Sequence, residues 1–319
     1  MKIAAARSFH DQYAEQVKCV VPHSSWALFE PDGSWSSSPA DCELAVLIGD
    51  AYCPPFKEAL LQISALKWVH TENSGIDGDF YERIIAKDII LTNSPGANAN
   101  EVVEFVIGLM LWTAKRFGSL SFHQSQHRWE RLPLQSLQGT TVLIVGLGHV
   151  GQPLARFCKA FGMHVLGIRK SPGPVADVDQ QGTLADLPRF LPRADVVVLA
   201  LELTPLTRGI MARREFQLMK STATLINVAR SQIVDLGDLR VALQEQAIGQ
   251  ACLDVLPAEP WPPDDPFWDL PNVFITPHIA WSSPFFRQRA SQMWLANLKR
   301  YVNREPLEDV IGEDHSFML

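Results

Sequence analysis

The sequence predicts an α/β protein with a doubly wound parallel sheet and a second, smaller α/β unit. Three observations indicate this fold class. Short apolar runs of strand length recur along the chain, helical patterns separate many of them, and one run ends in a glycine-rich turn that opens onto a helix. Alternation of this kind is typical of parallel sheets that carry helices on both faces.

The glycine-rich turn at 146–151 predicts a dinucleotide site. Gly146 permits a sharp bend, and Gly148 leaves no side chain where a diphosphate would approach the backbone. Gly151 lets the new helix pack against the strand, and the N–H groups at the start of that helix attract an anion. A second apolar run at 164–168 follows at the spacing of a βαβ unit, which favours a dinucleotide site over an ordinary turn.

The residue after that second run indicates which cofactor is bound. An acid that accepts hydrogen bonds from a ribose hydroxyl usually stands there, but this chain has Arg169, followed by Lys170 and Ser171. A guanidinium would attract a 2′-phosphate, so we expect NADP rather than NAD. The alternative is a solvated loop arginine that makes no contact with the ribose, and NAD is then a possible cofactor.

Four further runs after the glycine-rich unit read as buried strands of the same sheet. They are residues 194–200, 223–228, 250–255 and 273–276. Ligands of such sheets bind beyond the carboxyl ends of the strands, so the residues that follow the runs are candidates for the site. These candidates are Arg230, Glu259 and His278.

The first 91 or so residues predict a small α/β unit with its own parallel sheet. Its apolar runs are residues 17–21, 44–48, 67–70 and 89–92, and the segment 23–42 reads as irregular. Residues 71–77 read either as a backbone nest for a carboxylate or as an ordinary strand-to-helix turn. Long helices are expected at 97–116 and 282–301. Glu104 lies in the first of these helices. Its carboxylate either faces the polar side of the helix or belongs to a functional site.

Composition points to a small-molecule partner. Of the 319 residues, 47% are hydrophobic and 20% charged, and the formal net charge is −7. A net negative charge argues against nonspecific binding to nucleic acid or to an acidic membrane. The five cysteines form no C-x-x-C pair, so neither a disulfide framework nor a zinc or other metal site is predicted. Neither a secretory signal nor a membrane-spanning run is recognisable, and we expect a cytoplasmic protein.

Together the motifs resemble the D-isomer-specific 2-hydroxyacid dehydrogenase family, in particular its glyoxylate and hydroxypyruvate reductases. The resemblance covers nearly the whole chain. In order, its motifs are Ser74 to Asp77, Asn93 to Gly96 with Glu104, Leu137 to Gly139 before the glycine turn, Leu203 to Thr207, Asn227 to Arg230, Leu253 to Val255 with Glu259-Pro260, and Asn272 to His278.

The resemblance implies an oxidoreductase that transfers a hydride between NAD(P)H and a small 2-keto acid, giving a D-2-hydroxy acid. His278 would donate the proton, Glu259 would favour its imidazolium form, and Arg230 would bind the carboxylate and polarise the carbonyl. Backbone N–H groups around Ser74 and Gly75 would also hold the substrate carboxylate. Glyoxylate, hydroxypyruvate, pyruvate and bulkier keto acids are all compatible with these motifs.

The cofactor-binding residues implied by the glycine turn and the resemblance form one larger set. Asp254 would meet the nicotinamide amide. Two departures from the family pattern, Ser231-Gln232 after the arginine and Ala200, fall on the phosphate side of the site. The full set is Gly146, Gly148, His149, Val150, Gly151, Arg169, Lys170, Ser171, Thr204, Thr207, Val228, Ala229 and Asp254.

The family also implies how the chain divides. A Rossmann cofactor domain would span residues 99–284, and a smaller flavodoxin-like substrate-binding domain would combine 1–98 and 285–319. Members are usually dimers through the cofactor domain, so we expect a homodimer. The alternative function is a nucleotide-sensing binding protein, because corepressors with this fold resemble the family. Such a binding protein is expected to carry partner-docking extensions, and none is recognised after the last expected helix. The intact Arg, Glu and His set, with a turn that could hold a carboxylate, favours 2-keto acid chemistry over a different reaction such as formate oxidation.

Overall fold

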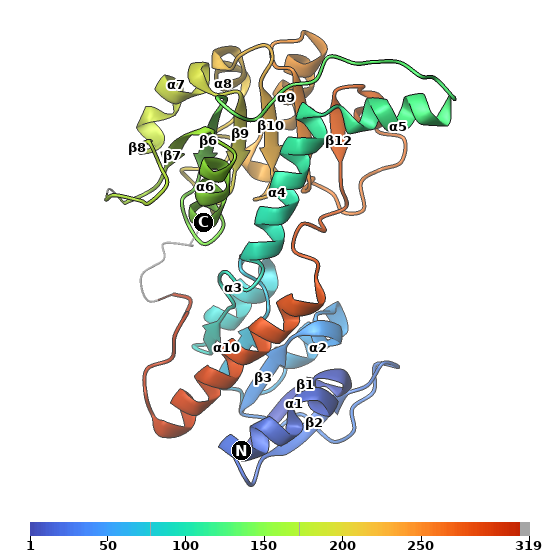
Figure 1. The fold of residues 1–319 in the computed structure, drawn as a ribbon. Coiled ribbons are helices and arrows are strands. Elements are labelled where there is room, and N and C mark those ends of the chain that lie inside the picture. Colours follow the sequence, from blue (N-terminus) through green and yellow to red (C-terminus); the bar gives the residue numbers. More distant parts are fainter. Residues whose placement is uncertain (77, 172, 313–319) are drawn as a thin grey trace. The chain divides into compact units, whose positions relative to one another are not determined.

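Residues 1–76, 78–171 and 173–312 are described by the computed structural model of this protein, and they form two compact units (Figure 1). The first unit comprises Met1–Asn98 and the segment from Ser283 onward, and the second comprises Ala99–Ser282. Two sequence-based expectations lie outside the described residues: Asp77, at the end of the first family motif, and residues 313–319 of the expected substrate domain.

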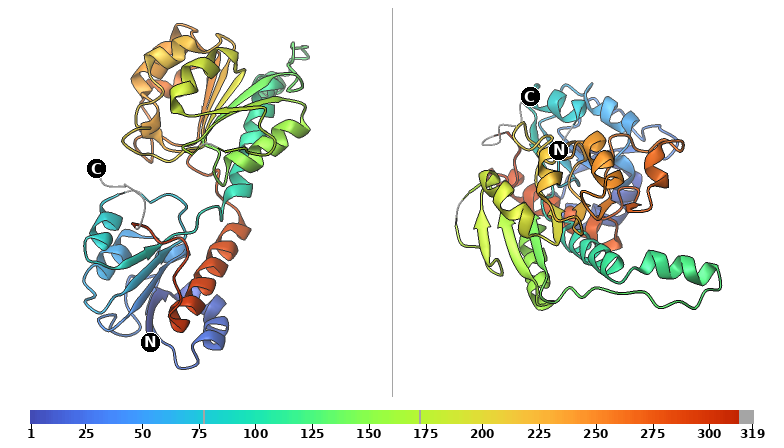
Figure 2. Two further views of the ribbon diagram at one scale, coloured as in Figure 1. Left: turned by 90° about the vertical axis from the view of Figure 1, so that its left-hand side faces the viewer. Right: turned by 90° about the horizontal axis from the view of Figure 1, so that it is seen from above.

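The first unit contains a five-stranded parallel sheet with the order β2-β1-β3-β4-β5, which is the flavodoxin-like order. Helices α1 and α10 pack on one face, and α2 and α3 pack on the other (Figure 2). The strands are β1 (Lys2–Ala6), β2 (Ser25–Phe29), β3 (Leu44–Leu47), β4 (Trp68–Thr71) and β5 (Ile90–Thr92). The helices are α1 (Arg7–Val20), α2 (Pro54–Leu60), α3 (Asp79–Ile85) and α10 (Pro284–Asn303), with a 3-10 turn η1 (Gly49–Ala51).

The prediction of a strand at 17–21 is wrong, because these residues lie at the end of α1 and in the turn after it. Phe9, Tyr13 and Val17 form the buried face of that helix, with a spacing of four residues. The first strand is instead β1, whose sequence has three alanines and therefore a weak local preference for strand. Pairing with β2 on one side and β3 on the other overrides that preference. Strand β2 lies inside the segment expected to be irregular.

The second unit contains a seven-stranded parallel sheet with the order β12-β11-β10-β9-β6-β7-β8. The sheet is wound outward from β6 in both directions, so the predicted doubly wound fold is confirmed. The strands are β6 (Thr141–Val145), β7 (His164–Ile168), β8 (Gln180–Gly182), β9 (Val196–Leu199), β10 (Thr224–Asn227), β11 (Gln250–Leu253) and β12 (Val273–Ile275).

Helices cover both faces of this sheet (Figure 2). On one face lie α4 (Ala99–Ala114) and α6 (Gly151–Ala160), and on the other lie α7 (Leu187–Phe190), α8 (Arg213–Leu218) and α9 (Leu236–Gln244). Helix α5 (Phe117–Ser125) continues from α4. Short 3-10 turns complete the unit: η2 (Leu184–Asp186), η3 (Leu191–Arg193), η4 (Ser231–Ile233) and η5 (Pro266–Asp269).

All six strands predicted for the second unit are present, and of the described strands in this unit the sequence missed only the edge strand β8. Its sequence, Gln-Gln-Gly, lacks an apolar pattern, and among the described strands it pairs only with β7. Both predicted long helices are also present. Helix α10 begins where Ser283 Oγ accepts hydrogen bonds from the N–H groups of Phe285 and Phe286, followed by Pro284 in the first turn.

Candidate functional site

Three neighbouring strands of the second unit place the candidate catalytic residues at one edge of the sheet. Asn227, Leu253 and Ile275 are opposite one another in the register of β10, β11 and β12. Each is the last residue of its strand. Arg230 and His278 follow their strands by three residues, and the loop after β11 carries Glu259. The carboxyl ends of the strands are where such sheets bind ligands.

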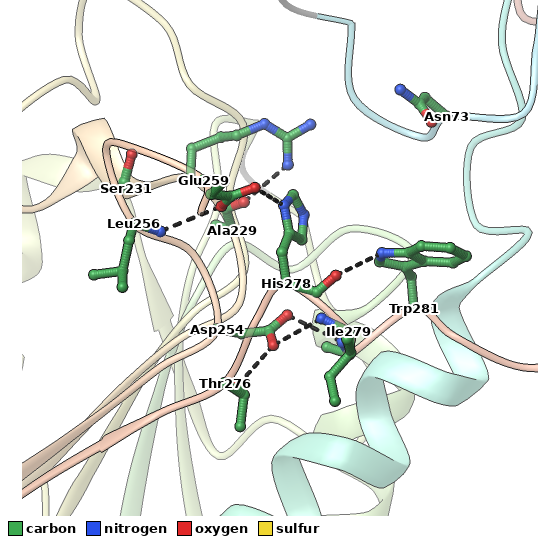
Figure 3. A network of polar contacts seen from close by, with 12 residues as sticks. Asn73, Ala229, Ser231, Asp254, Leu256, Glu259, Thr276, His278, Ile279 and Trp281 are labelled. Atoms are coloured by element: carbon green, nitrogen blue, oxygen red, sulfur yellow. Dashed lines mark hydrogen bonds and ion pairs between the residues drawn. The ribbon is translucent and has the colours of Figure 1, made fainter. Parts of the chain in front are cut away.

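His278 and Glu259 form an ion pair in this loop region (Figure 3). The Nδ1 atom of the imidazole lies 2.9 Å from Oε2 of the carboxylate. The other carboxylate oxygen accepts a 3.4 Å hydrogen bond from the N–H of Leu256, which holds the Glu259 side chain toward the histidine. The two side chains are 39% and 44% exposed, so solvent or a ligand can reach the pair.

The buried carboxylate of Asp254 holds the turn that carries His278. Oδ1 accepts hydrogen bonds from Thr276 Oγ1 (2.6 Å) and from the N–H of Ile279 (3.0 Å), while Oδ2 accepts one from the N–H of Ala280 (3.0 Å). Asp254 is 2% exposed. The expectation from the family was a nicotinamide contact, and the structure adds this anchoring of the backbone on both sides of His278.

The backbone of His278 adopts the left-handed conformation, with φ of 52°. This conformation is uncommon for a residue other than glycine and is maintained only where the surroundings enforce it. The His278 N–H donates to the carbonyls of Asp254 (2.8 Å) and Thr276 (3.0 Å), and its own carbonyl accepts from Trp281 Nε1 (2.8 Å) (Figure 3). The direction of the imidazole is therefore set by the turn.

Arg230 is positioned by a second buried polar side chain, that of Asn227. Asn227 Oδ1 accepts from the N–H of Ala229 (3.0 Å), and its Nδ2 donates to the Arg230 carbonyl (3.0 Å). The Arg230 guanidinium donates from Nη1 to the Ala229 carbonyl at 2.8 Å. Figure 3 shows Ala229 beside Glu259 and His278, so the β10 turn and the ion pair share this edge of the sheet. Sequence reasoning missed the clamping role of Asn227, although the residue opens a family motif.

The glycine turn between β6 and α6 has the steric properties of a diphosphate site. A Cβ atom on Gly146 would lie 2.4 Å from the carbonyl oxygen of Ala200, and one on Gly151 would lie 1.9 Å from the carbonyl oxygen of Gly146. Packing therefore requires glycine at both positions. A Cβ on Gly148 would meet nothing within 4 Å, so this residue faces open space in front of the helix N-terminus.

The remaining predicted cofactor residues surround this turn or follow neighbouring strands. Arg169 comes directly after β7, and its N–H donates to Gly182 of β8 (3.0 Å). Its guanidinium has no hydrogen-bond or ion-pair partner in the described part of the chain. Thr207 Oγ1 accepts from the N–H of Thr204 (2.7 Å) and so closes the loop after β9. His149, Lys170 and Ser171 are exposed, Val150 and Val228 are partly buried, and Ala229 is buried.

Ser74 and Gly75 lie in the first unit, in the loop after β4, and both are partly exposed. Ser74 Oγ donates to the carbonyl of Ser94 (3.1 Å) and to Asn98 Oδ1 (2.8 Å). Glu104 lies on the exposed face of α4. Within residues 1–76, 78–171 and 173–312, no group of three His, Cys, Asp or Glu residues could hold a metal ion, and no helix is long and apolar enough to cross a bilayer.

Comparison with known proteins finds matches over most of this chain. Residues 107–280 match the family described as D-isomer specific 2-hydroxyacid dehydrogenase, NAD binding domain. The chain is 34% identical over 249 residues to the glyoxylate reductase of Thermococcus gammatolerans, which covers 75% of this chain and 74% of that protein. It is 32% identical over 259 residues to the D-3-phosphoglycerate dehydrogenase of Methanocaldococcus jannaschii. That match covers 80% of this chain but 49% of the relative, about half its length.

Two solved structures extend the similarity to both units. A D-isomer specific 2-hydroxyacid dehydrogenase family protein from Aeromonas salmonicida has a TM-score of 0.84 and 30% identity, over 98% of this chain and 99% of that one. A D-isomer specific 2-hydroxyacid dehydrogenase from Xanthobacter autotrophicus, solved with NADPH and MES, has a TM-score of 0.79 and 26% identity, over 98% of each chain.

Proposed function

The chain belongs to the D-isomer-specific 2-hydroxyacid dehydrogenase family, and on this basis we propose that it reduces a small 2-keto acid to a D-2-hydroxy acid with NADPH. The observation that carries the proposal is the His278–Glu259 ion pair at the carboxyl edge of the cofactor-binding sheet. Reduction of a ketone requires a hydride donor, a proton donor and, for a keto acid, a cation for the carboxylate. A bound nicotinamide supplies the hydride.

His278 supplies the proton, and Glu259 supports it in this role. Because Nδ1 of His278 faces Glu259, Nε2 is the ring nitrogen left to donate a proton to the developing alkoxide. The Glu259 carboxylate stabilises the imidazolium through a charge-assisted hydrogen bond. Arg230 binds the substrate carboxylate and polarises the carbonyl, and the N–H groups of Ser74 and Gly75 bind the carboxylate as well. The nicotinamide amide would lie near Asp254.

The preference for NADPH rests on Arg169 and on the absence of an acid after β7. A 2′-phosphate presents oxygens that a guanidinium can bind in pairs, and the Arg169 guanidinium has no hydrogen-bond or ion-pair partner among the residues that the structure describes. Lys170 and Ser171 add a cation and a donor in the same loop. The relative from Xanthobacter autotrophicus was solved with NADPH, which supports this choice.

The homodimer also belongs to this proposal. The candidate interface is the segment 117–134, and its exposed apolar side chains argue for a second copy. Trp129 is fully exposed, and Phe117, Phe122 and Leu134 are 47%, 59% and 51% exposed. A cytoplasmic location stays a prediction from the sequence. No finding supports the nucleotide-sensing alternative.

A panel of 2-keto acids tests the proposed function. Glyoxylate and hydroxypyruvate come first because of the relative named glyoxylate reductase, followed by pyruvate and bulkier keto acids, each with NADPH and with NADH. We expect turnover of at least one small acid to the D product. His278→Ala serves as the control, with turnover lowered about 10²- to 10⁴-fold and NADPH binding retained. A folded, NADPH-binding protein that reduces none of the acids would refute the proposal.

A further inference from the structure

The loop that follows β4 in the first unit is tied to the end of the neighbouring strand β5. The two strands pair in parallel, with His70 opposite Thr92. Beyond that pair, the N–H of Ser94 donates to the Asn73 carbonyl (3.1 Å), and Nδ2 of Asn93 donates to the Ser74 carbonyl (2.8 Å). Two consecutive carbonyls of the loop are thus held by two consecutive residues after β5.

These two bonds also set the direction of two N–H groups. In a planar trans peptide the carbonyl and the N–H of one peptide unit point in opposite directions. Because Ser94 holds the Asn73 carbonyl, the Ser74 N–H points away from β5. Because Asn93 holds the Ser74 carbonyl, the Gly75 N–H does so too. Neither N–H donates to any residue within the described ranges.

The donors themselves are held in a buried polar network. Asn93 is 6% exposed, and Ser94 is fully buried. Ser94 Oγ lies 3.0 Å from Nε2 of His70 and donates to the Thr71 carbonyl (3.2 Å). His70 Nδ1 lies 2.8 Å from Thr92 Oγ1, so the imidazole holds Thr92 and Ser94, the residues on either side of Asn93. Burial lowers the pKa of His70 to about 3, so the ring is neutral at physiological pH.

We propose that Asn93 is a positioning residue for substrate binding: its amide orients the Ser74–Gly75 peptide so that the Gly75 N–H binds the 2-keto acid carboxylate. This inference rests on the proposed function and deepens it. Asn93 reaches the substrate only through the peptide that it holds. Loss of its amide therefore weakens carboxylate binding and leaves the cofactor site, which lies in the second unit, unchanged.

The experiment compares Asn93→Ala and Asn93→Asp with the parent. Both variants remove the donor, and the aspartate keeps the side-chain volume. A hydrogen bond to a charged group contributes about 1.5 to 3 kcal/mol, so we expect KM for the best 2-keto acid to rise about 10- to 100-fold. KM for NADPH should stay unchanged, and kcat at saturation should fall much less than KM rises. Binding of oxamate, a carboxylate analogue of the substrate, should weaken by the same factor as KM.

Asn297→Ala is the matched control. Asn297 is 3% exposed in the same unit, and its Nδ2 also donates to a backbone carbonyl, that of Glu308, at 2.8 Å. Its loss removes the bond to Glu308, next to Asp309, whose carbonyl accepts the Asn93 N–H at 3.3 Å, but it leaves the bond to the Ser74 carbonyl in place. KM and oxamate affinity should therefore change much less than in the Asn93 variants. An Asn93 variant with parental KM and oxamate affinity, or an equal rise in Asn297→Ala, would overturn the positioning role and leave the proposed function intact. A parent that reduces no 2-keto acid would overturn both.

Discussion

At the scale of single residues, the buried carboxylate of Asp254 supports the backbone around His278, the proposed proton donor. Its three hydrogen bonds hold the turn in which His278 adopts a left-handed backbone. Asp254→Asn keeps the shape but presents an NH₂ group to at least one backbone donor. An unsatisfied buried donor costs about 1 to 3 kcal/mol, so the turn should loosen.

We expect Asp254→Asn to lower kcat at least about tenfold, since about 1.4 kcal/mol of transition-state stabilisation corresponds to a factor of ten. The dissociation constant for NADPH should change less than kcat. Steady-state kinetics and a fluorescence titration with NADPH would separate the two effects. A variant that lost NADPH affinity but kept kcat would show that the nicotinamide contact, and not the turn, is the main role of Asp254.

Arg169 is the second single residue with a predicted effect: its side chain should determine the preference for NADPH over NADH. A 2′-phosphate carries close to two negative charges, and hydrogen bonds to charged groups contribute about 1.5 to 3 kcal/mol, so this arginine alone should give about a 10- to 100-fold preference for NADPH. Arg169→Asp should reverse the preference, because a carboxylate repels the phosphate and accepts the ribose hydroxyl. The test is kcat/KM for both cofactors at fixed low salt. An unchanged ratio would mean that Arg169 does not contact the ribose.

At the scale of secondary-structure elements, a buried histidine on strand β4 should make the stability of the first unit depend on pH. The pKa of His70 on β4 is lowered by burial to about 3, whereas the unfolded chain keeps about 6.5. Between these values the unfolded state binds a proton that the folded state does not, so the free energy of unfolding falls as pH falls from 6.5 toward 3. From pH 7 to pH 5 the loss from this residue is about 2 kcal/mol.

His70→Asn removes the titration and keeps hydrogen-bonding capacity. The variant should be less stable than the parent at pH 7 but should lose about 2 kcal/mol less between pH 7 and pH 5. Hydrogen exchange at the amides of β4, corrected for its intrinsic pH dependence, measures this within the first unit. Parallel pH profiles for the two proteins would contradict a neutral buried histidine.

At the scale of the whole molecule, the exposed apolar segment 117–134 should determine the oligomeric state. We expect a dimer by sedimentation and a shift toward monomer in Trp129→Ala, because a fully exposed indole contributes large apolar area to an interface. Trp268→Ala is the matched control: Trp268 belongs to the same unit, is 48% exposed and lies outside the segment. A parent that is monomeric at micromolar concentration would contradict the interface.

Features that depend on residues close together in the chain could be predicted from the sequence. The glycine spacing of the turn after β6, the apolar strand before it and the helix after it are all local features, so the doubly wound sheet could be predicted. The same pattern indicates the end of the sheet at which a ligand is expected. The positions of Arg230 and His278 follow from counting residues past each strand. Strands with weak local signals, β1 and β8, escaped prediction because pairing with neighbours makes them strands.

The polar side chains that support the candidate site could be identified only in the folded structure. Asp254 bonds to a backbone N–H 25 residues away, and Asn93 to a carbonyl 19 residues away. No local pattern distinguishes such residues from ordinary strand-end polar residues. Their role arises because parallel strands bring distant loops to one edge of a sheet, where a buried polar group must find a partner and so fixes the backbone that it bonds.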